Sequence, residues 1–384
     1  MSVRDYPGAA TGIILAGAGA GYAAGVVGPA VRGIAAEFDV SLTSIGLLTS
    51  VFFAGIVVLN FGIPNLERRL GVRTTAQLSP VLMGVGGILS TVAPAFWFLL
   101  IGRAVCGLGV ALALVMGGII GRAVGGGMLV GAFGAAITVA VAVALALGGA
   151  LAGAGIDWRV DFAVSAALGL SALPFLVARV PEHAVAKGRP GRDLLRAFAN
   201  WSFWPVAFLF VLTAGVPMLV SAWIVHYLTQ DDAMTAAAAG ALGFLLFAVS
   251  TVARPAGGRI DDRHHRAILV MSPFLAAAGF VLLGVDNAPA FAVPAIVAMG
   301  IGFSIPYAVS YIRSEDLVPN EPTVGLSAEL LLVNATPIVV APVIGAAFEH
   351  DHAGAAWLGL AAFAVVAGVV NLPRRGRQSG TIAP

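Results

Sequence analysis

Long apolar stretches separated by short polar segments run along the whole chain. They lack the strict alternation of apolar and polar residues that marks the strands of a membrane barrel, so they indicate helices. A helix needs about 20 mostly apolar residues to cross a bilayer, and each stretch is close to that length. The predicted membrane helices are residues 10–31, 43–63, 75–93, 96–121, 128–152, 160–178, 201–228, 234–255, 267–285, 289–312, 323–347 and 354–372.

The longest hydrophilic stretch divides these twelve predicted helices into two sets of six. It runs from Arg179 to Asn200 and is broken by prolines and glycines. We therefore expect a first six-helix bundle in residues 1–180, a cytoplasmic linker in residues 181–200, and a second six-helix bundle in residues 201–384.

Composition and charge place these helices in a membrane and orient them. The chain is 59% hydrophobic and only 10% charged, whereas about a quarter of residues are charged in soluble domains. When the predicted helices are threaded back and forth, 18 of the 21 lysines and arginines fall in segments on one side. Basic segments are retained in the cytoplasm. We therefore expect a multi-pass protein of the inner (cytoplasmic) membrane with both termini in the cytoplasm.

Three arginines depart from this pattern. Arg32 and Arg159 fall on the outer side, and Arg103 falls inside a predicted helix. The other basic residues report membrane topology, so the net charge of +2 predicts no nucleic-acid partner. The expected surroundings are the lipid bilayer and a small-molecule substrate, and we expect a monomer.

Two polar loops occupy equivalent places in the two halves. One follows the second predicted helix and the other follows the eighth. Internal duplication of this kind suits a transporter whose two halves rock about a central site. The residues concerned are Glu67, Arg68, Arg69, Gly71 and Arg73 in the first half, and Gly258, Asp262, Arg263 and Arg266 in the second.

These loops resemble the cytoplasmic signature of the major facilitator superfamily, roughly G-x-L-x-D-R-x-G-R-R. The second-half loop matches well, whereas in the first half Pro64 stands for the glycine and Arg68 for the aspartate, with Glu67 beside it. The R-x-x-x-G-x-G sequence from Arg103 and the W-R-x-x-F sequence from Trp158 are also similar to superfamily motifs. The resemblance implies an all-α polytopic membrane protein with twelve transmembrane helices in two pseudo-symmetric six-helix bundles. It further implies that the two loops act in cytoplasmic gating.

The same resemblance implies a gradient-driven secondary transporter that moves a small solute by alternating access, with protons as the expected coupling ion. No G-x-x-x-x-G-K-[ST] nucleotide motif occurs in the chain. The segment from Arg254 to Gly258 is similar to cyanate-type and nitrate/nitrite porters, but Asn60 stands where nitrate porters place an arginine, which argues against nitrate.

Two alternatives stay open at this point. The first is a drug or metabolite efflux antiporter, although the proline typical of the fifth helix in drug antiporters is missing here. The second, from another class, is a membrane-embedded enzyme or a sensor without flux. An enzyme would need paired acid and base groups at one depth, and the chain offers none by our count, so we expect no enzymatic activity.

Two ionisable residues inside predicted helices are candidates for substrate binding or ion coupling. Arg103 lies about 10 Å below the outer boundary at 1.5 Å per residue, and burying it costs about 3 kcal/mol, so it needs a partner. In one interpretation Arg103 is a cation that binds an anion or takes part in proton coupling, and this favours an anionic or strongly dipolar substrate. In the other, it bonds to carbonyls of neighbouring helices and stabilises one conformation. Glu329 is either a proton carrier in the eleventh helix or a residue that caps that helix in water.

The remaining candidates are polar side chains on helix faces that could line the substrate path. The alternative for each is packing between helices. They are Tyr22 in the first predicted helix, Asn60 in the second, Tyr307 and Tyr311 in the tenth, and Asn334 in the eleventh.

Two further motifs predict no cofactor and no metal. Gly17-Ala-Gly-Ala-Gly21 imitates a dinucleotide fingerprint, but no strand precedes it, so close packing between helices is the better interpretation. Glu349-His-Asp-His352 lacks a fourth ligand nearby in sequence, so we expect no metal site there.

Overall fold

The chain is helical throughout the part that the computed structural model describes, namely residues 5–177, 197–257, 262–316 and 322–372. Within these ranges the side chains of residues 255–257, 262–266, 308, 309, 311–316 and 322–326 lie outside the description. The helical elements are α1 (Pro7–Gly25), α2 (Val27–Phe38), α3 (Leu42–Thr91), α4 (Phe96–Gly153), α5 (Trp158–Ser171), α6 (Leu173–Val177), α8 (Phe203–Phe210), the π-helix η1 (Val211–Gly215), α9 (Val216–Leu228), the 3-10 helix η2 (Gln230–Asp232), α10 (Ala236–Gly257), α11 (Asp262–Val285), α12 (Pro289–Asp316), α13 (Pro322–Glu349) and α14 (Ala353–Val370).

Nine helical stretches in the described residues are long and apolar enough to cross a membrane. A tenth crossing is the pair α1 and α2, which is bent by 45°. The bend at Val26 has a local cause, because Pro29 has no N–H to donate to the carbonyl of Gly25. Large apolar side chains such as Val58, Val252 and Met271 lie on the outer surface, as expected of helices that face lipid.

The 50-residue helix α3 folds back on itself at Gly71. This residue has φ 79° and ψ 164°, a conformation that strongly favours glycine. A Cβ added at Gly55 would lie 2.6 Å from the carbonyl oxygen of Ala104, and one added at Gly86 would lie 2.4 Å from the nitrogen of Cys106. Residues nearly equidistant from Gly71 therefore meet the same turn of α4, which shows that the two arms run antiparallel.

The 58-residue helix α4 folds in the same way at Gly126, where φ is 61°. A Cβ added at Gly117 would lie 2.4 Å from the ring of Phe133, and one added at Gly121 would lie 3.4 Å from the side chain of Val130. When each folded helix counts as two crossings, and α1 with α2 as one, the described helices make an even number of crossings. Both described ends of the chain then lie on the same side.

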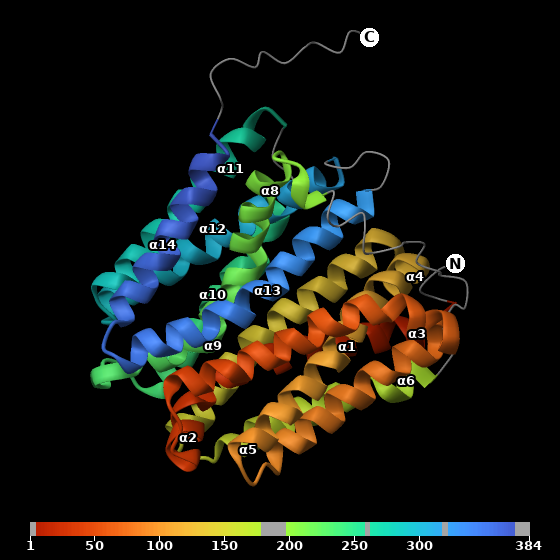
Figure 1. Cartoon of the computed structure of the whole chain (residues 1–384), viewed down its shortest axis with the longest axis horizontal. Coiled ribbons are helices and arrows are strands. Elements are labelled where there is room, and N and C mark those ends of the chain that lie inside the picture. Colours follow the sequence, from red (N-terminus) through yellow and green to blue (C-terminus); the bar gives the residue numbers. More distant parts are fainter. Residues whose placement is uncertain (1–4, 178–196, 258–261, 317–321, 373–384) are drawn as a thin grey trace.

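Two names for the sides of the molecule are used below. The terminal side carries Gly71, Gly126 and both described ends of the chain. The distal side carries Asp39, Trp158 and Asp232. In Figure 1 the helices run obliquely, with α2, α5 and α9 toward the lower left, α11 near the top and α4 at the right.

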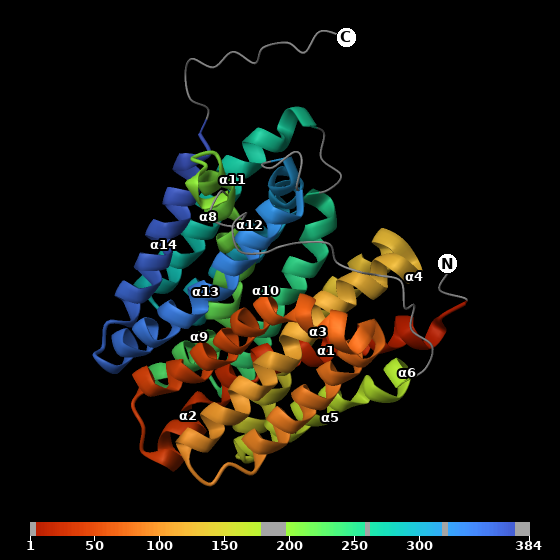
Figure 2. The same ribbon diagram turned by 45° about the vertical axis from the view of Figure 1, so that its right-hand side comes forward.

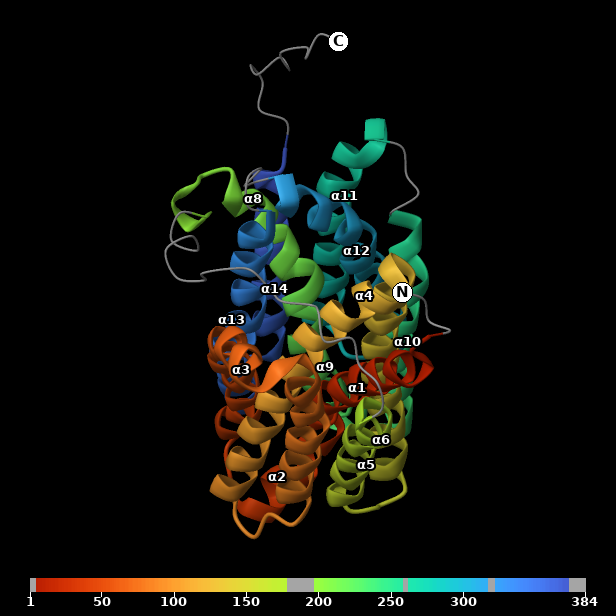
Figure 3. The same cartoon turned by 90° about the vertical axis from the view of Figure 1, so that its right-hand side faces the viewer.

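The helices form two groups that follow the order of the chain. In Figure 1 the first half, coloured red to yellow, lies at the lower right, and the second half, coloured green to blue, lies at the upper left. The turned view in Figure 2 keeps the two groups apart, and in Figure 3 the first half fills most of the lower part of the view. This arrangement is the all-α membrane fold with two helix bundles that the sequence predicts.

The two halves are joined mainly on the distal side. Ser50 Oγ donates to the carbonyl oxygen of Ile338 at 2.7 Å, and Thr43 Oγ1 donates to Glu349 at 2.8 Å. Arg32 donates to the carbonyl oxygen of Thr229. The backbone N–H of Thr43 also donates to Glu349, and a fourth pair, Arg254 and Thr138, joins the halves near the middle of the crossing.

Glycines bring the helices of the two halves into close contact on the same side. A Cβ added at Gly46 would lie 2.5 Å from Cα of Pro342, and one added at Gly149 would lie 2.8 Å from Cα of Gly240. Such separations leave no room for any side chain, so backbones touch directly. The two halves therefore touch, backbone to backbone, at these two places on the distal side.

The glycine-rich segment of α1 also serves packing, as the sequence predicts. A Cβ added at Gly17 would lie 2.8 Å from the ring of Phe133, and one added at Gly21 would lie 2.1 Å from the carbonyl oxygen of Ile137. Both partners belong to the second arm of α4. The spacing of four residues places the two glycines on one helix face, which α4 covers closely.

We predict that Gly126→Ala destabilises the protein by about 1 to 3 kcal/mol, because alanine is strained at a positive φ. The measurement is the thermal unfolding midpoint of the purified protein. Gly127→Ala is the matched control, since this neighbour also has open space for a Cβ but has no positive φ. Equal midpoints for the two variants would contradict the fold of α4 at Gly126.

Candidate functional site

Arg103 is fully enclosed between helices of the first half. Its side chain is 2% exposed. Nη1 donates to the carbonyl oxygen of Ala23 at 2.7 Å, and the guanidinium lies 4.3 Å from the ring centroid of Phe52. Nε has no hydrogen-bond partner among the described residues. These contacts match the second interpretation of Arg103, an arginine bonded to the backbone of a neighbouring helix.

A second arginine, Arg254, reaches the boundary between the two halves. It belongs to α10, and its Nη1 donates to Thr138 Oγ1 in the second arm of α4 at 3.3 Å. Its guanidinium lies 4.3 Å from the ring centroid of Tyr307 in α12, within range of a cation–π interaction. Its Nε is buried without a hydrogen-bond partner in the described structure.

Sequence reasoning missed Arg254 because it counted this residue among the topology markers on the cytoplasmic side. A signal was present, since Arg254 is the last but one residue of the predicted helix 234–255. Side chains on a helix lean toward its N-terminus. The N-terminus of α10 is on the distal side, so the long side chain of Arg254 points back from the terminal side toward the middle of the crossing.

Aromatic rings support Arg254 from the second half. The rings of Phe210 and Tyr307 are stacked, with centroids 5.7 Å apart and an interplanar angle of 24°. Phe210 directly precedes the π-helix η1. Pro217 explains this π-turn, because it has no N–H for the carbonyl of Thr213 and its ring crowds the preceding turn. The irregular turn lies where the helix meets the Arg254 cluster.

No described contact joins the other predicted path residues to Arg254. Asn334 Nδ2 donates to the carbonyl oxygen of Leu330 in its own helix at 2.7 Å. Asn60 Oδ1 is buried and has no hydrogen-bond partner among the described residues. Glu329 is fully buried within α13, and it does not cap a helix end in water. The side chain of Tyr311 lies outside the described residues.

Tyr22 bonds to a carboxylate that the sequence reasoning passed over. Its hydroxyl donates to Asp161 Oδ1 in α5. Asp161 is 2% exposed, so Glu329 is not the only carboxylate buried inside a membrane helix. The sequence placed Asp161 at the edge of a predicted helix, where a carboxylate is expected to reach water. Packing of α1 and α4 against α5 encloses it instead.

The first-half gating loop is described in part. Gly71 forms the turn of α3, and the side chain of Glu67 is buried. Arg68 donates to Asn65, and Arg73 donates to the carbonyl oxygen of Val177. Arg69 is exposed. In the second-half loop, Gly258 and the side chains of Asp262, Arg263 and Arg266 lie outside the described residues.

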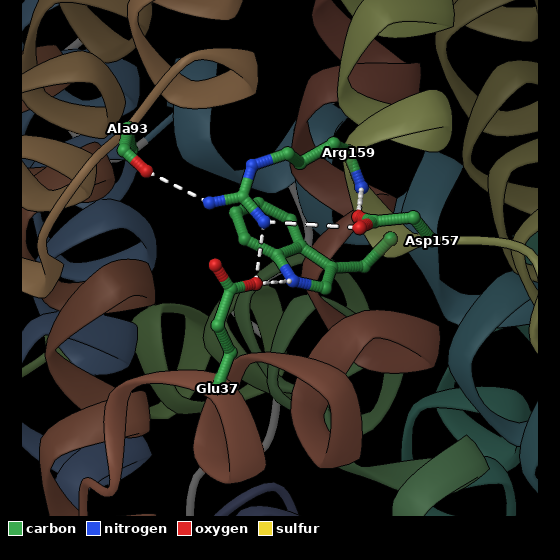
Figure 4. A network of polar contacts seen from close by, with 5 residues as sticks. Glu37, Ala93, Asp157 and Arg159 are labelled. Carbon is green, nitrogen blue, oxygen red and sulfur yellow. Dashed lines mark hydrogen bonds and ion pairs between the residues drawn. The ribbon is translucent and has the colours of Figure 1, made fainter.

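The W-R-x-x-F segment closes the distal side of the first half (Figure 4). Glu37 at the end of α2 accepts hydrogen bonds from Trp158 Nε1 at 2.8 Å and from Arg159. Arg159 also donates from Nη2 to the carbonyl oxygen of Ala93 at 2.8 Å. Asp157 caps the start of α5 by accepting from the Arg159 backbone N–H at 2.8 Å. The network ties α2 and α5 to the loop after α3.

Metal-ligating side chains are scattered in the described part of the chain. No three His, Cys, Asp or Glu residues there are placed to share a metal ion. In the Glu349-His-Asp-His352 segment, the carboxylate of Glu349 accepts hydrogen bonds from the backbone N–H and the hydroxyl of Thr43. That carboxylate therefore joins the two halves.

The chain belongs to the Major Facilitator Superfamily. The model of this family matches residues 13–328, which is most of the chain. The protein is accordingly a secondary transporter with multiple membrane crossings, and not an enzyme. No curated protein sequence matches the chain.

Solved structures of transporters share the fold at low sequence identity. A bacterial homologue of the human lysosomal transporter Spinster, in an inward-facing and unoccupied conformation, aligns with a TM-score of 0.76 at 18% identity, over 94% of this chain and 95% of its own. A D-xylose-proton symporter aligns with a TM-score of 0.77 at 15% identity, over 95% and 96%. The human organic anion transporter MFSD10 aligns with a TM-score of 0.69 at 15% identity, over 96% and 99%.

We predict that Arg103→Gln lowers the thermal unfolding midpoint, because it removes the cation over Phe52 and weakens the bond to Ala23. The expected loss is about 1 to 3 kcal/mol, the usual cost of leaving a buried polar group without its partner. Arg122→Gln is the control, since Arg122 is exposed on the same helix. An Arg103→Gln protein as stable as the wild type would show that the buried charge is not retained for stability.

Proposed function

We propose that this secondary transporter carries a small anionic solute across the inner membrane by alternating access and couples its movement to protons. The observation that carries the proposal is the position of Arg254. Its guanidinium contacts Thr138 of the first half and Tyr307 of the second, near the middle of the crossing. A solute bound there would touch both halves, as alternating access requires.

The charge of Arg254 supports an anionic substrate. No described carboxylate lies within ion-pair distance of Arg254. Its hydrogen bond to Thr138 is long at 3.3 Å, and its Nε has no partner in the described structure. A carboxylate or another oxyanion would accept charge-assisted hydrogen bonds from Nη1 and from Nε of Arg254. Arg103 is a weaker candidate because its contacts are already made within the first half.

The same proposal assigns an orientation and a domain division. The terminal side faces the cytoplasm, because most basic residues lie on that side and basic segments stay in the cytoplasm. Both termini are then cytoplasmic. The first bundle comprises residues 1–180, the linker residues 181–200, and the second bundle residues 201–384.

With that orientation the structure corresponds to an inward-facing state. Three of the four described hydrogen-bonded pairs between the halves lie on the distal side, which becomes the outer side. Backbones there touch at Gly46 and Gly149. The likeness to a transporter solved in an inward-facing conformation supports this assignment.

Two observations support protons as the coupling ion and an organic anion as the solute. Two carboxylates, Glu329 and Asp161, are buried inside membrane helices, where proton relay is one of the roles that such groups serve. One similar structure is a D-xylose-proton symporter and another is an organic anion transporter. Under this proposal the polar residues Tyr22, Asn60, Tyr311 and Asn334 line the path or its edges.

The proposal is tested with the purified protein in proteoliposomes. Small radiolabelled anions, beginning with mono- and dicarboxylates, are offered under an imposed proton gradient with and without a protonophore. We expect at least one carboxylate to accumulate and the protonophore to abolish its accumulation. Transport of neutral or cationic solutes only would overturn the anionic assignment, and accumulation in the opposite sense of the gradient would identify an exporter.

We predict that Arg254→Gln lowers uptake of the carboxylate by about tenfold to a hundredfold, because a hydrogen bond to a charged group contributes about 1.5 to 3 kcal/mol. Arg122→Gln makes the same substitution at an exposed position and is expected to transport normally. Tyr307→Phe keeps the ring over the guanidinium and is expected to retain most uptake, whereas Tyr307→Leu is expected to lose it. Normal uptake by Arg254→Gln would remove this residue from the site.

A further inference from the structure

A cavity of about 760 Å³ opens on the distal side between the two halves. It is bounded by α2, the ends of α4 and α9, the start of α5, η2 and the start of α10. Glu37 and Asp157, two of its lining residues, belong to the network of Figure 4. The charged or titratable residues that line it are Arg32, Glu37, Asp157, Asp161, His226 and Asp232.

Two of these side chains are more than nine-tenths buried and carry polar atoms that have no hydrogen-bond partner among the described residues. Asp161 is 2% exposed, and its Oδ2 accepts no hydrogen bond. His226 is 8% exposed, and neither ring nitrogen is hydrogen-bonded. Buried polar groups are nearly always satisfied, so unsatisfied groups that border a cavity point to a ligand.

The charges of the cavity favour a cation. Four carboxylates and one arginine line it. The carboxylates of Glu37 and Asp157 are within ion-pair distance of Arg159, and Arg32 donates to the carbonyl oxygen of Thr229. Asp161 has no cation within ion-pair distance in the described structure. An isolated carboxylate in a membrane helix is costly, and a bound cation removes that cost.

Gly148 allows the carboxylate of Asp161 to pack directly against the backbone of α4. A Cβ added at Gly148 would lie 2.4 Å from Asp161 Oδ2. The other oxygen, Oδ1, is already occupied by the hydroxyl of Tyr22. Oδ2 is therefore the atom available to a ligand at the inner end of the cavity.

We propose that the distal cavity admits a small monovalent cation, a proton or Na⁺, to Asp161 Oδ2, and that this carboxylate is the coupling-ion site of the transporter. The coupling role of this site rests on the proposed function, whereas the binding of the cation does not. It replaces Glu329 with Asp161 as the residue that receives the coupling ion.

The position of Asp161 gives the cation a route to the rest of the protein. Its partner Tyr22 precedes Ala23, whose carbonyl oxygen accepts the hydrogen bond of Arg103. Both residues directly precede the 45° bend between α1 and α2. A change of charge at Asp161 therefore acts on the hinge of the first crossing, where helix ends of both halves meet.

Several other groups face Asp161, and a measurement of pH dependence must distinguish the titration of Asp161 from theirs. They are Tyr22 in α1, Arg32 and Glu37 in α2, Asp157 before α5, His226 in α9 and Asp232 in η2, whereas α4 and α10 contribute no charged or titratable residue to the lining. Of these, His226 is the one that titrates near neutral pH when unperturbed. His226→Gln therefore accompanies the Asp161 variants.

The test measures binding to the purified full-length protein, without any transport substrate. Na⁺ is titrated against N-methylglucamine at constant ionic strength, and tryptophan fluorescence is followed, since Trp158 lines the same cavity. Proton binding is followed by the carboxylic-acid carbonyl band in infrared difference spectra.

The test variant is Asp161→Asn, which keeps the size of the side chain and the acceptor for Tyr22 but removes the charge. Asp231→Asn is the matched control, because Asp231 is exposed on the same side and its left-handed backbone suits asparagine.

We expect either a saturable Na⁺ response or an acid-induced carboxyl band that is present in the wild type, in Asp231→Asn and in His226→Gln, and lost in Asp161→Asn. A Na⁺ response identifies the ion as Na⁺, and a carboxyl band alone identifies it as the proton. A response that survives in Asp161→Asn, or the absence of both responses in the wild type, overturns the proposal.

Two further measurements keep the result interpretable. Tyr22→Phe leaves the carboxylate in place and is expected to keep the cation response with a shifted midpoint, so it reports on the site even if Asp161→Asn does not fold. Binding of a transported anion, measured by thermal shift, is expected to persist in Asp161→Asn. Failure of the anion proposal therefore appears in the Arg254 variants, and failure of the cation site appears in the Asp161 variants.

Discussion

The hydrocarbon core of a bilayer offers no partner to a polar group, and every part of this structure depends on that constraint. Backbone groups must bond within their own segment, so the chain crosses the membrane only as helices. Helices gain little from the hydrophobic effect when lipid surrounds them, and they associate where small residues let backbones touch. Gly21 against Ile137 and Gly46 against Pro342 are such contacts. The first holds one half together, and the second joins the two halves on the distal side.

Charged side chains inside the helices face the same constraint and meet it in different ways. Arg103 is satisfied within one half by the carbonyl of Ala23 and the ring of Phe52, so it moves with that half as a unit. Arg254 is held between halves, by Thr138 on one side and Tyr307 on the other. A motion that separates the halves breaks the second set of contacts and spares the first. This difference makes Arg254 the residue suited to sense a solute between the bundles.

The proposed cation site and the buried Arg103 are linked through the first crossing. Tyr22 contacts Asp161, and the next residue, Ala23, contacts Arg103. Pro29 bends the same crossing a few residues later, at the level where Gly28 meets the backbone of Ser221 in the second half. A single helix therefore connects a buried carboxylate, a buried arginine and the contact between bundles. Such an arrangement allows ion binding in one half to change how the halves meet.

Much of the fold follows from one-dimensional features of the sequence. Apolar length predicted the crossings, the breaks at Gly71 and Gly126 fall in gaps between predicted helices, and motif positions indicated the superfamily. These features are legible because the bilayer imposes a fixed length and a fixed polarity on each crossing. Sequence also singled out Arg103, Glu329, Tyr22 and Tyr307 as polar groups in an apolar setting.

Which of these groups meet was decided by tertiary structure. Arg254 was interpreted as a topology marker and Asp161 was not considered. A position in the sequence gives the depth of a residue in the membrane only to within a turn or two, and it does not tell which way the side chain points across the bundle. The lean of the Arg254 side chain, the stacking of Phe210 on Tyr307 and the enclosure of Asp161 by Tyr22 and Gly148 arise from packing among helices far apart in the chain. The sequence by itself determined that this protein crosses the membrane as a transporter of the superfamily. Only the packing of the helices decided which charges lie between the halves, because a charge inside a bilayer must be stabilised by partners, and helices far apart in the sequence supply them.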